Sequence, residues 1–150
     1  MDRTSLFHGS LVTTSRILYT PSAFARTSLI HLQETGFLEA RKPHKSRREN
    51  LASCLFFQVL SGHGTLEYMG ETFPLITGDC AFLDCRRPYS HCTSDELWQL
   101  KWAHFYGPNM NSIYEKYAER GGRPCFHPAD PSPYGRILDE LYETASSEDH

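Results

Sequence analysis

Apolar and polar positions alternate with a short period through the middle of the chain. A series of short apolar runs occupies residues 54–106, and glycine-containing turns separate most of them. The predicted strands are Leu55–Leu60, Thr65–Tyr68, Glu71–Ile76, Cys80–Leu83, Tyr89–Cys92 and Leu97–Tyr106. Short strands at this spacing predict an all-β sandwich or barrel.

The last predicted strand has the clearest alternation. Successive side chains of a strand point to opposite faces of its sheet. One face carries Trp98, Leu100, Trp102, His104 and Tyr106, and the other carries Leu97, Gln99, Lys101, Ala103 and Phe105. Both tryptophans of the chain therefore share a face.

The apolar period changes to that of a helix after Gly107. A first helix, which Asn109 can cap, is predicted from apolar residues at Met110, Ile113, Tyr114, Tyr117 and Ala118. A second begins at Ser132 with Pro133 in its first position. Its apolar stripe consists of Tyr134, Ile137, Leu138, Leu141, Tyr142 and Ala145.

The N-terminal part is less regular. Residues 1–25 predict an arm with a short strand or two, and Ser28–Leu32 predicts a strand that Gly36 bends or ends. Residues 39–50 are the most charged part of the chain, with Arg41, Lys42, Lys45, Arg47 and Arg48. Either this segment is a solvated loop or strand edge, or one arginine turns inward to hold a polar ligand.

Composition limits the class of protein. With 150 residues and a net charge of −3, the chain as a whole does not resemble a nucleic-acid binder. No signal core or run of ~20 apolar residues occurs, so five reduced cysteines in a cytoplasmic protein are expected. A zinc site from Cys80, Cys85, His91 and Cys92 is the alternative, but it lacks a paired-cysteine motif.

Two stretches together resemble a known family. They are LFFQVLSGHGTLEYMGETFPLITGD, and GDCAFLDCRRPYSH followed by LWQLKWAHFYG. Their order and spacing resemble the N-terminal cupin-type effector domain of AraC-type transcription regulators, over roughly residues 26–145. The resemblance implies a double-stranded β-helix (cupin or jelly-roll) barrel followed by two amphipathic helices, so the expected fold is mainly β.

The resemblance also implies a domain organisation and a function. Residues 1–25 would be an arm, 26–107 a ligand-binding barrel, and 108–150 a helical dimerisation and linker segment. The chain would sense a small molecule, often a sugar, and would contact DNA only through a C-terminal domain that this chain lacks. The stripe of the second helix would then form a homodimer contact, although it can equally cover the barrel.

The pattern of metal-binding cupins is not matched. Their glutamate position falls on Leu55 and their late histidine position on Tyr89, and neither His44 nor His91 restores the set. We therefore expect no metal, no cofactor and no enzymatic activity. There are two alternatives. One is a stand-alone cupin enzyme, either an isomerase or an oxygenase, and the other is a simple carbohydrate-binding module.

The resemblance places effector contacts at Arg47, in the stretch Tyr89–His91, and at Trp102. A histidine contact of the family corresponds to Leu100 and is absent. An indole face can cover the apolar side of a sugar, while arginine, tyrosine and histidine bond its hydroxyls. The predicted ligand-binding residues are Arg47, His91, Trp102, Tyr89, Trp98, Arg48 and Asp84. Alternatively, the tryptophans and His91 belong to the core, His104 is structural, and Asp84 pairs with Arg87.

Overall fold

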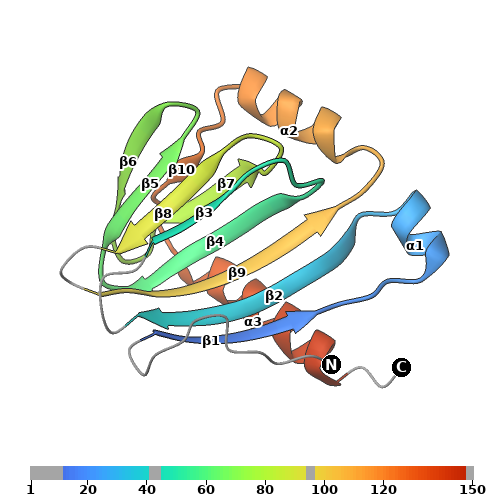
Figure 1. The fold of residues 1–150 in the computed structure, drawn as a ribbon, viewed down its shortest axis with the longest axis horizontal. Coiled ribbons are helices and arrows are strands. Elements are labelled where there is room, and N and C mark those ends of the chain that lie inside the picture. The colour runs from blue at the N-terminus through green and yellow to red at the C-terminus, as the bar shows by residue number, and fades with distance from the viewer. Residues whose placement is uncertain (1–11, 41–44, 94–96, 148–150) are drawn as a thin grey trace.

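Two antiparallel sheets face each other in the computed structural model, which describes residues 12–40, 45–93 and 97–147 (Figure 1). The larger sheet has the order β1 (Val12–Leu18), β2 (His31–Ala40), β9 (Gln99–Tyr106), β4 (Cys54–Ser61), β7 (Cys80–Asp84) and β10 (Cys125–Phe126). The smaller sheet has the order β3 (Lys45–Arg48), β8 (Tyr89–Thr93), β5 (Gly64–Tyr68) and β6 (Glu71–Leu75). The six strands predicted between residues 54 and 106 are confirmed.

The core lies between the two sheets. Strand β5 shows why, because its buried and exposed residues alternate strictly, with Leu66 and Tyr68 inside and Glu67 outside. Phe57 from the larger sheet and Trp98, just before β9, join the same buried cluster. The hydrophobic core therefore fills the space between the two sheets at the centre of the molecule.

Two glycines allow tryptophan rings to approach the backbone. A Cβ atom at Gly36 would lie 2.5 Å from Trp102, and one at Gly64 would lie 2.6 Å from Trp98. Both distances are too short for any other residue type. Gly36 therefore lies in the middle of β2, where the Trp102 ring packs against its backbone. It does not end the strand.

Helix α3 (Ser132–Ser147) packs on the outer face of the larger sheet (Figure 1). Its Leu138 and Ala145 are buried, and the Tyr142 hydroxyl lies 2.6 Å from that of Ser15. Helix α2 (Met110–Glu119) packs beside β7, where the Tyr114 hydroxyl donates to the carbonyl of Phe82. None of the helices in the described residues is long and apolar enough to cross a lipid bilayer.

The N-terminal prediction is corrected. Helix α1 (Ala23–Ser28) precedes β2, because the Ser22 side chain accepts a hydrogen bond from the Ala25 amide and starts a helical turn. The strand begins at His31 and not at Ser28. The predicted cap of α2 is also wrong in detail, since Asn109 stands at that position without a side-chain capping bond.

Candidate ligand-binding site

A buried acidic side chain lies on the inner face of the larger sheet. Glu34 of β2 is only 8% exposed, and its carboxylate accepts a 2.8 Å hydrogen bond from Trp102 Nε1. Arg16 of β1 approaches the same carboxylate at 3.5 Å. Burying a carboxylate is costly unless donors and a positive charge compensate it. Glu34 is therefore held in place by groups from two neighbouring strands.

His104 lies directly across the strand pair from Glu34. Its Nε2 is 4.0 Å from a carboxylate oxygen of Glu34, and its Nδ1 is 2.9 Å from the Ser53 hydroxyl. The pKa of His104 is lowered to about 4, because burial, together with the charge of Arg48, outweighs the opposite effect of Glu34. The imidazole is therefore neutral at pH 7.

Two polar groups flank the His104 ring. The Ser53 hydroxyl lies 2.9 Å from Nδ1 and donates to the Cys54 carbonyl at 3.3 Å. The Glu34 carboxylate lies 4.0 Å from Nε2, which is beyond hydrogen-bond distance. The Ser53 hydroxyl, the His104 ring and the Glu34 carboxylate thus form a polar row inside the barrel.

Arg48 brings a positive charge to the same region. It is half-buried in β3, across from Tyr89, which is only 4% exposed. Residues paired across neighbouring antiparallel strands face the same side, so Arg48 shares the inner face with Tyr89. We call Glu34, Arg48, Trp102 and His104 the inner polar cluster.

Three other predicted site residues also lie on the inner face. Tyr89 is buried, and the His91 ring lies 5.8 Å from the rings of both Phe57 and Trp98. Trp98 is fully buried, and its Nε1 has no hydrogen-bond partner within the described residues. These side chains border the core, so their predicted ligand contacts stay predictions.

Arg47 is separated from the others. It is exposed on the outer face of the smaller sheet, because it precedes Arg48 and neighbouring residues of a strand face opposite ways. It lines a shallow groove of about 270 Å³ together with Glu67, Ser90 and other residues. In this structure Arg47 does not share a face with Trp102.

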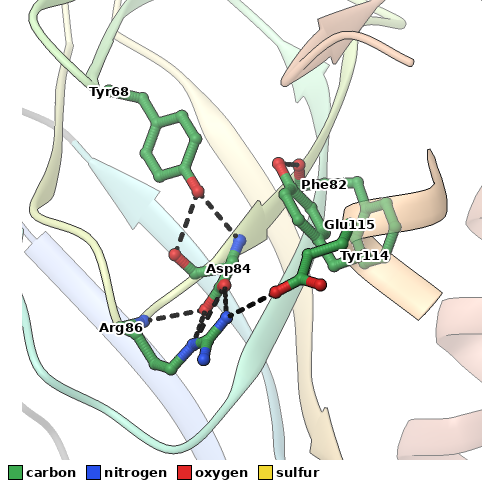
Figure 2. Close-up of polar contacts among 6 residues, drawn as sticks. All are labelled: Tyr68, Phe82, Asp84, Arg86, Tyr114 and Glu115. Carbon is green, nitrogen blue, oxygen red and sulfur yellow. Dashed lines mark hydrogen bonds and ion pairs between the residues drawn. The ribbon is translucent and has the colours of Figure 1, made fainter. Parts of the chain in front are cut away.

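Asp84 lies at the end of β7, next to α2, as Figure 2 shows. Burial would raise the pKa of Asp84, but hydrogen bonds from the Arg86 side chain and backbone outweigh it and hold the pKa below its usual value. The partner is Arg86, at 2.7 Å, and not Arg87 as expected. Tyr68 bonds the backbone of Asp84, so this carboxylate serves the junction between barrel and helix.

Metal ligands are not grouped in the described part of the chain. Within residues 12–40, 45–93 and 97–147, no three His, Cys, Asp or Glu side chains lie close enough to hold a metal ion. Burial raises the pKa of Cys80 and Cys85 to about 12, so both thiols are protonated at neutral pH. Zinc binds the deprotonated thiolate form of cysteine. Cys80 and Cys85 are two of the four ligands in the zinc site that the sequence offered as an alternative.

Three residues of this site were missed from the sequence. Glu34 lies just beyond the strand predicted at Ser28–Leu32, Arg16 lies in the predicted arm, and Ser53 lies just before the strand predicted from Leu55. A β-bulge between Leu32 and Glu34 interrupts the alternation, and the regular inward series is Glu34, Gly36, Leu38 and Ala40. His104 was expected to be structural, although it shares its strand face with Trp102.

Comparison with known proteins supports the fold. No protein-family model matches the chain, and no curated protein matches it. Similar solved structures include the cupin domain of Cnp3 from Schizosaccharomyces pombe, with a TM-score of 0.51 and 14% identity over 75% of this chain and 72% of that chain. A predicted oxalate decarboxylase from Thermotoga maritima has a TM-score of 0.54 and 14% identity, over 70% of this chain and 90% of that one.

A third similar structure is an HTH_3 family transcriptional regulator from Vibrio cholerae. Its TM-score is 0.51 and its identity 13%, over 63% of this chain and 51% of that chain. At such identities the likeness shows the fold alone.

The prediction that the chain is not an enzyme is contradicted. A structure with the same fold carries the name of a predicted oxalate decarboxylase, so the fold gives no ground for excluding catalysis. The prediction of the fold itself is confirmed by the two facing antiparallel sheets and by the similar cupin structures. The chain has the cupin fold, a double-stranded β-helix barrel followed by helices.

Proposed function

We propose that the barrel binds a small polar ligand at the inner polar cluster. The supporting observation is that the side chains of Glu34, Arg48 and His104 lie on the inner side of the barrel. The half-buried indole of Trp102 lies there with them. Carboxylate and guanidinium groups bond hydroxyls, and an indole covers the apolar face of a sugar ring. A monosaccharide or sugar acid is therefore the proposed class of ligand.

We further propose that this binding serves a transcription regulator. The resemblance of the sequence to AraC-type effector domains supports this, as does the occurrence of the fold in a transcriptional regulator from Vibrio cholerae. The N-terminal arm, the barrel and the helical segment 108–150 would act as one sensing unit. DNA contact would come from another domain, and a homodimer would be the working form.

The ligand test compares two adjacent arginines. The chain is titrated by calorimetry with a panel of monosaccharides and sugar acids. Arg48→Met removes the inner charge, and Arg47→Met is its matched control on the outer face. We expect Arg48→Met to weaken binding by about tenfold or more, as for loss of a charged hydrogen bond, and Arg47→Met to leave it unchanged. Equal losses for both variants would refute the inner site.

Catalysis is a second candidate at the same cluster. Glu34 and the neutral His104 are both groups that can accept a proton from a bound hydroxyl. Any sugar that binds is incubated with the chain, and its NMR spectrum is followed for a new product. Product that forms with the wild type and not with His104→Asn supports catalysis, and an unchanged spectrum leaves binding as the function.

The predicted dimer is tested separately. The expected contact residues Tyr134, Leu138, Tyr142 and Ala145 all touch or face the chain's own sheet, whereas Ile137 is 56% exposed. A dimer through α3 would therefore rely on the exposed edge of that helix. Sedimentation at micromolar concentration should show a dimer, and a monomer at all concentrations would refute this proposal.

A further inference from the structure

A recess of about 370 Å³ opens on the outer face of the larger sheet, between that sheet and helices α2 and α3. Its walls include six aromatic side chains, each from a different helix or strand. These are Phe56, Phe82, Phe105, Tyr117, Phe126 and Tyr134. All six are half-buried, so each keeps part of its ring accessible from the recess.

The rings form two separate groups. Under α3, Phe56 stacks on Tyr134 with ring centres 5.7 Å apart, and Phe126 meets Tyr134 edge-on at 5.7 Å. Under α2, Phe82 stacks on Phe105 at 6.1 Å and meets Tyr117 edge-on at 5.0 Å. Such contacts hold aromatic rings in defined orientations. The aromatic side chains at both ends of the recess are therefore held in defined positions by their contacts with one another.

The lining between the two groups includes a small residue. Ala103 of β9 pairs directly with Phe56 and lines the recess, where its neighbours are large. A larger side chain at this position would occupy part of the recess. The opposite side is formed by α3, through the buried Leu138, Leu141, and the 56% exposed Ile137.

The chemistry of the recess selects its occupant. Its lining contains no charged residue and no amide or hydroxyl side chain apart from two tyrosines. One of these hydroxyls, that of Tyr117, already donates to the carbonyl of Arg123. A sugar or an ion would lose its water here without gaining partners, which costs several kcal/mol. An apolar molecule would gain by leaving water.

Size narrows the choice further. An apolar cavity of about 150 Å³ binds one benzene ring, so a recess of this volume suits roughly two to three rings. A standard protein interface takes about 800 Å² from each partner, which is a broad surface and not a single recess. We propose that this recess is a second binding site, for an uncharged aromatic or alicyclic small molecule of two to three rings. It is separate from the inner polar cluster and does not depend on the function proposed for it.

The test uses N-phenyl-1-naphthylamine, an uncharged three-ring probe whose fluorescence rises in apolar surroundings. The 150-residue chain is titrated with this probe. Ile137→Glu places a charge at the recess, and Ile113→Glu is the matched control, an exposed isoleucine of α2 that does not line it. We expect saturable binding of one probe per chain, weakened about tenfold or more by Ile137→Glu and unchanged by Ile113→Glu.

Three further readouts decide the outcome. Unlabelled biphenyl should displace the probe, and Arg48→Met should leave probe binding unchanged, which separates this site from the inner one. Failure of the wild type to bind the probe would overturn the proposal, as would equal affinity of the two glutamate variants. A dimer that dissociates in Ile137→Glu and binds no probe would assign the recess to a second copy of the chain.

Discussion

Strand β9 separates two surfaces of opposite chemistry. On its inner face, Trp102 and His104 meet the buried carboxylate of Glu34. On its outer face, Ala103 and Phe105 line an apolar recess under the helices. The alternation of the strand puts these surfaces one sheet thickness apart, so adjacent residues serve environments of different polarity. A single strand can therefore contribute to a polar site and to an apolar one.

The two faces also differ in burial. The inner face packs against the second sheet, whereas the outer face lies under α2 and α3. Substitutions of the same kind on the two faces should consequently differ in cost, and residues next to each other in sequence provide natural controls.

The largest expected difference is between two adjacent phenylalanines of β4. Phe57 is 1% exposed and lies in the core, whereas Phe56 is half-buried on the recess. Phe57→Ala should lower the free energy of unfolding by about 3–5 kcal/mol. Phe56→Ala should cost about 1–2 kcal/mol, because less apolar area is lost. Urea unfolding measures both values, and equal costs would contradict the assignment of the two faces.

The next effect is the pH dependence caused by His104. Its pKa is lowered to about 4 in the folded state, against about 6.5 in an unfolded chain. Between these values the unfolded chain binds a proton that the folded barrel does not, so stability falls as pH falls. From pH 7 to pH 4 this site should contribute a loss of about 3 kcal/mol.

The control for this prediction is His104→Asn, which cannot take up the proton. Its unfolding free energy should depend less steeply on pH than that of the wild type over the same range. If both proteins lose stability equally between pH 7 and pH 4, the protonation of His104 is not the cause.

The comparison also shows what the sequence could predict. The strands between residues 54 and 106 and the start of α3 follow from short periodic patterns and turn residues, which act locally. Trp102 was singled out because the resemblance to effector domains places a contact there, and the clear alternation of its strand predicted the face that it shares with His104. Glu34 was not, because its strand partner in β9 lies far along the chain and its charge resembles that of a surface residue. Glu34 faces the interior because β2 pairs with β9, and this long-range pairing cannot be seen in a local sequence pattern.

The two arginines of β3 also show that strand pairing decides which residues face the interior. The resemblance to effector domains pointed to Arg47, whereas the register of β3 against β8 turns Arg48 inward. A shift of one residue exchanges the faces of a whole strand. The sequence indicated the segment that carries Arg47 and Arg48. The strand pairing then shows that Arg48 is the one of the two that faces inward.

A smaller effect should follow from filling the space above Gly36. A methyl group there would lie 2.5 Å from Trp102 and 2.6 Å from the carbonyl oxygen of Ser15. Gly36→Ala should displace the indole from Glu34 and cost about 1–3 kcal/mol. Gly135→Ala in α3 is the control, since the added methyl group would meet only the side-chain oxygen of Gln58, at 3.1 Å. The control should cost less than Gly36→Ala, because the clash is milder and alanine favours the helix, and a tryptophan emission shift should occur only in Gly36→Ala.

The smallest expected difference is between two serines whose hydroxyls bond side chains distant in the sequence, Ser53 with His104 and Ser15 with Tyr142 of α3. The Ser53 hydroxyl is buried against His104 Nδ1 at 2.9 Å, and the Ser15 hydroxyl meets Tyr142 at a partly exposed position. Ser53→Ala should cost about 1–2 kcal/mol, since it leaves a buried nitrogen without its hydrogen-bond partner, and Ser15→Ala about half as much. In a His104→Asn background the two serine costs should become similar, because the ring nitrogen that Ser53 meets is then already gone. If Ser53→Ala costs the same in both backgrounds, Ser53 does not orient the histidine.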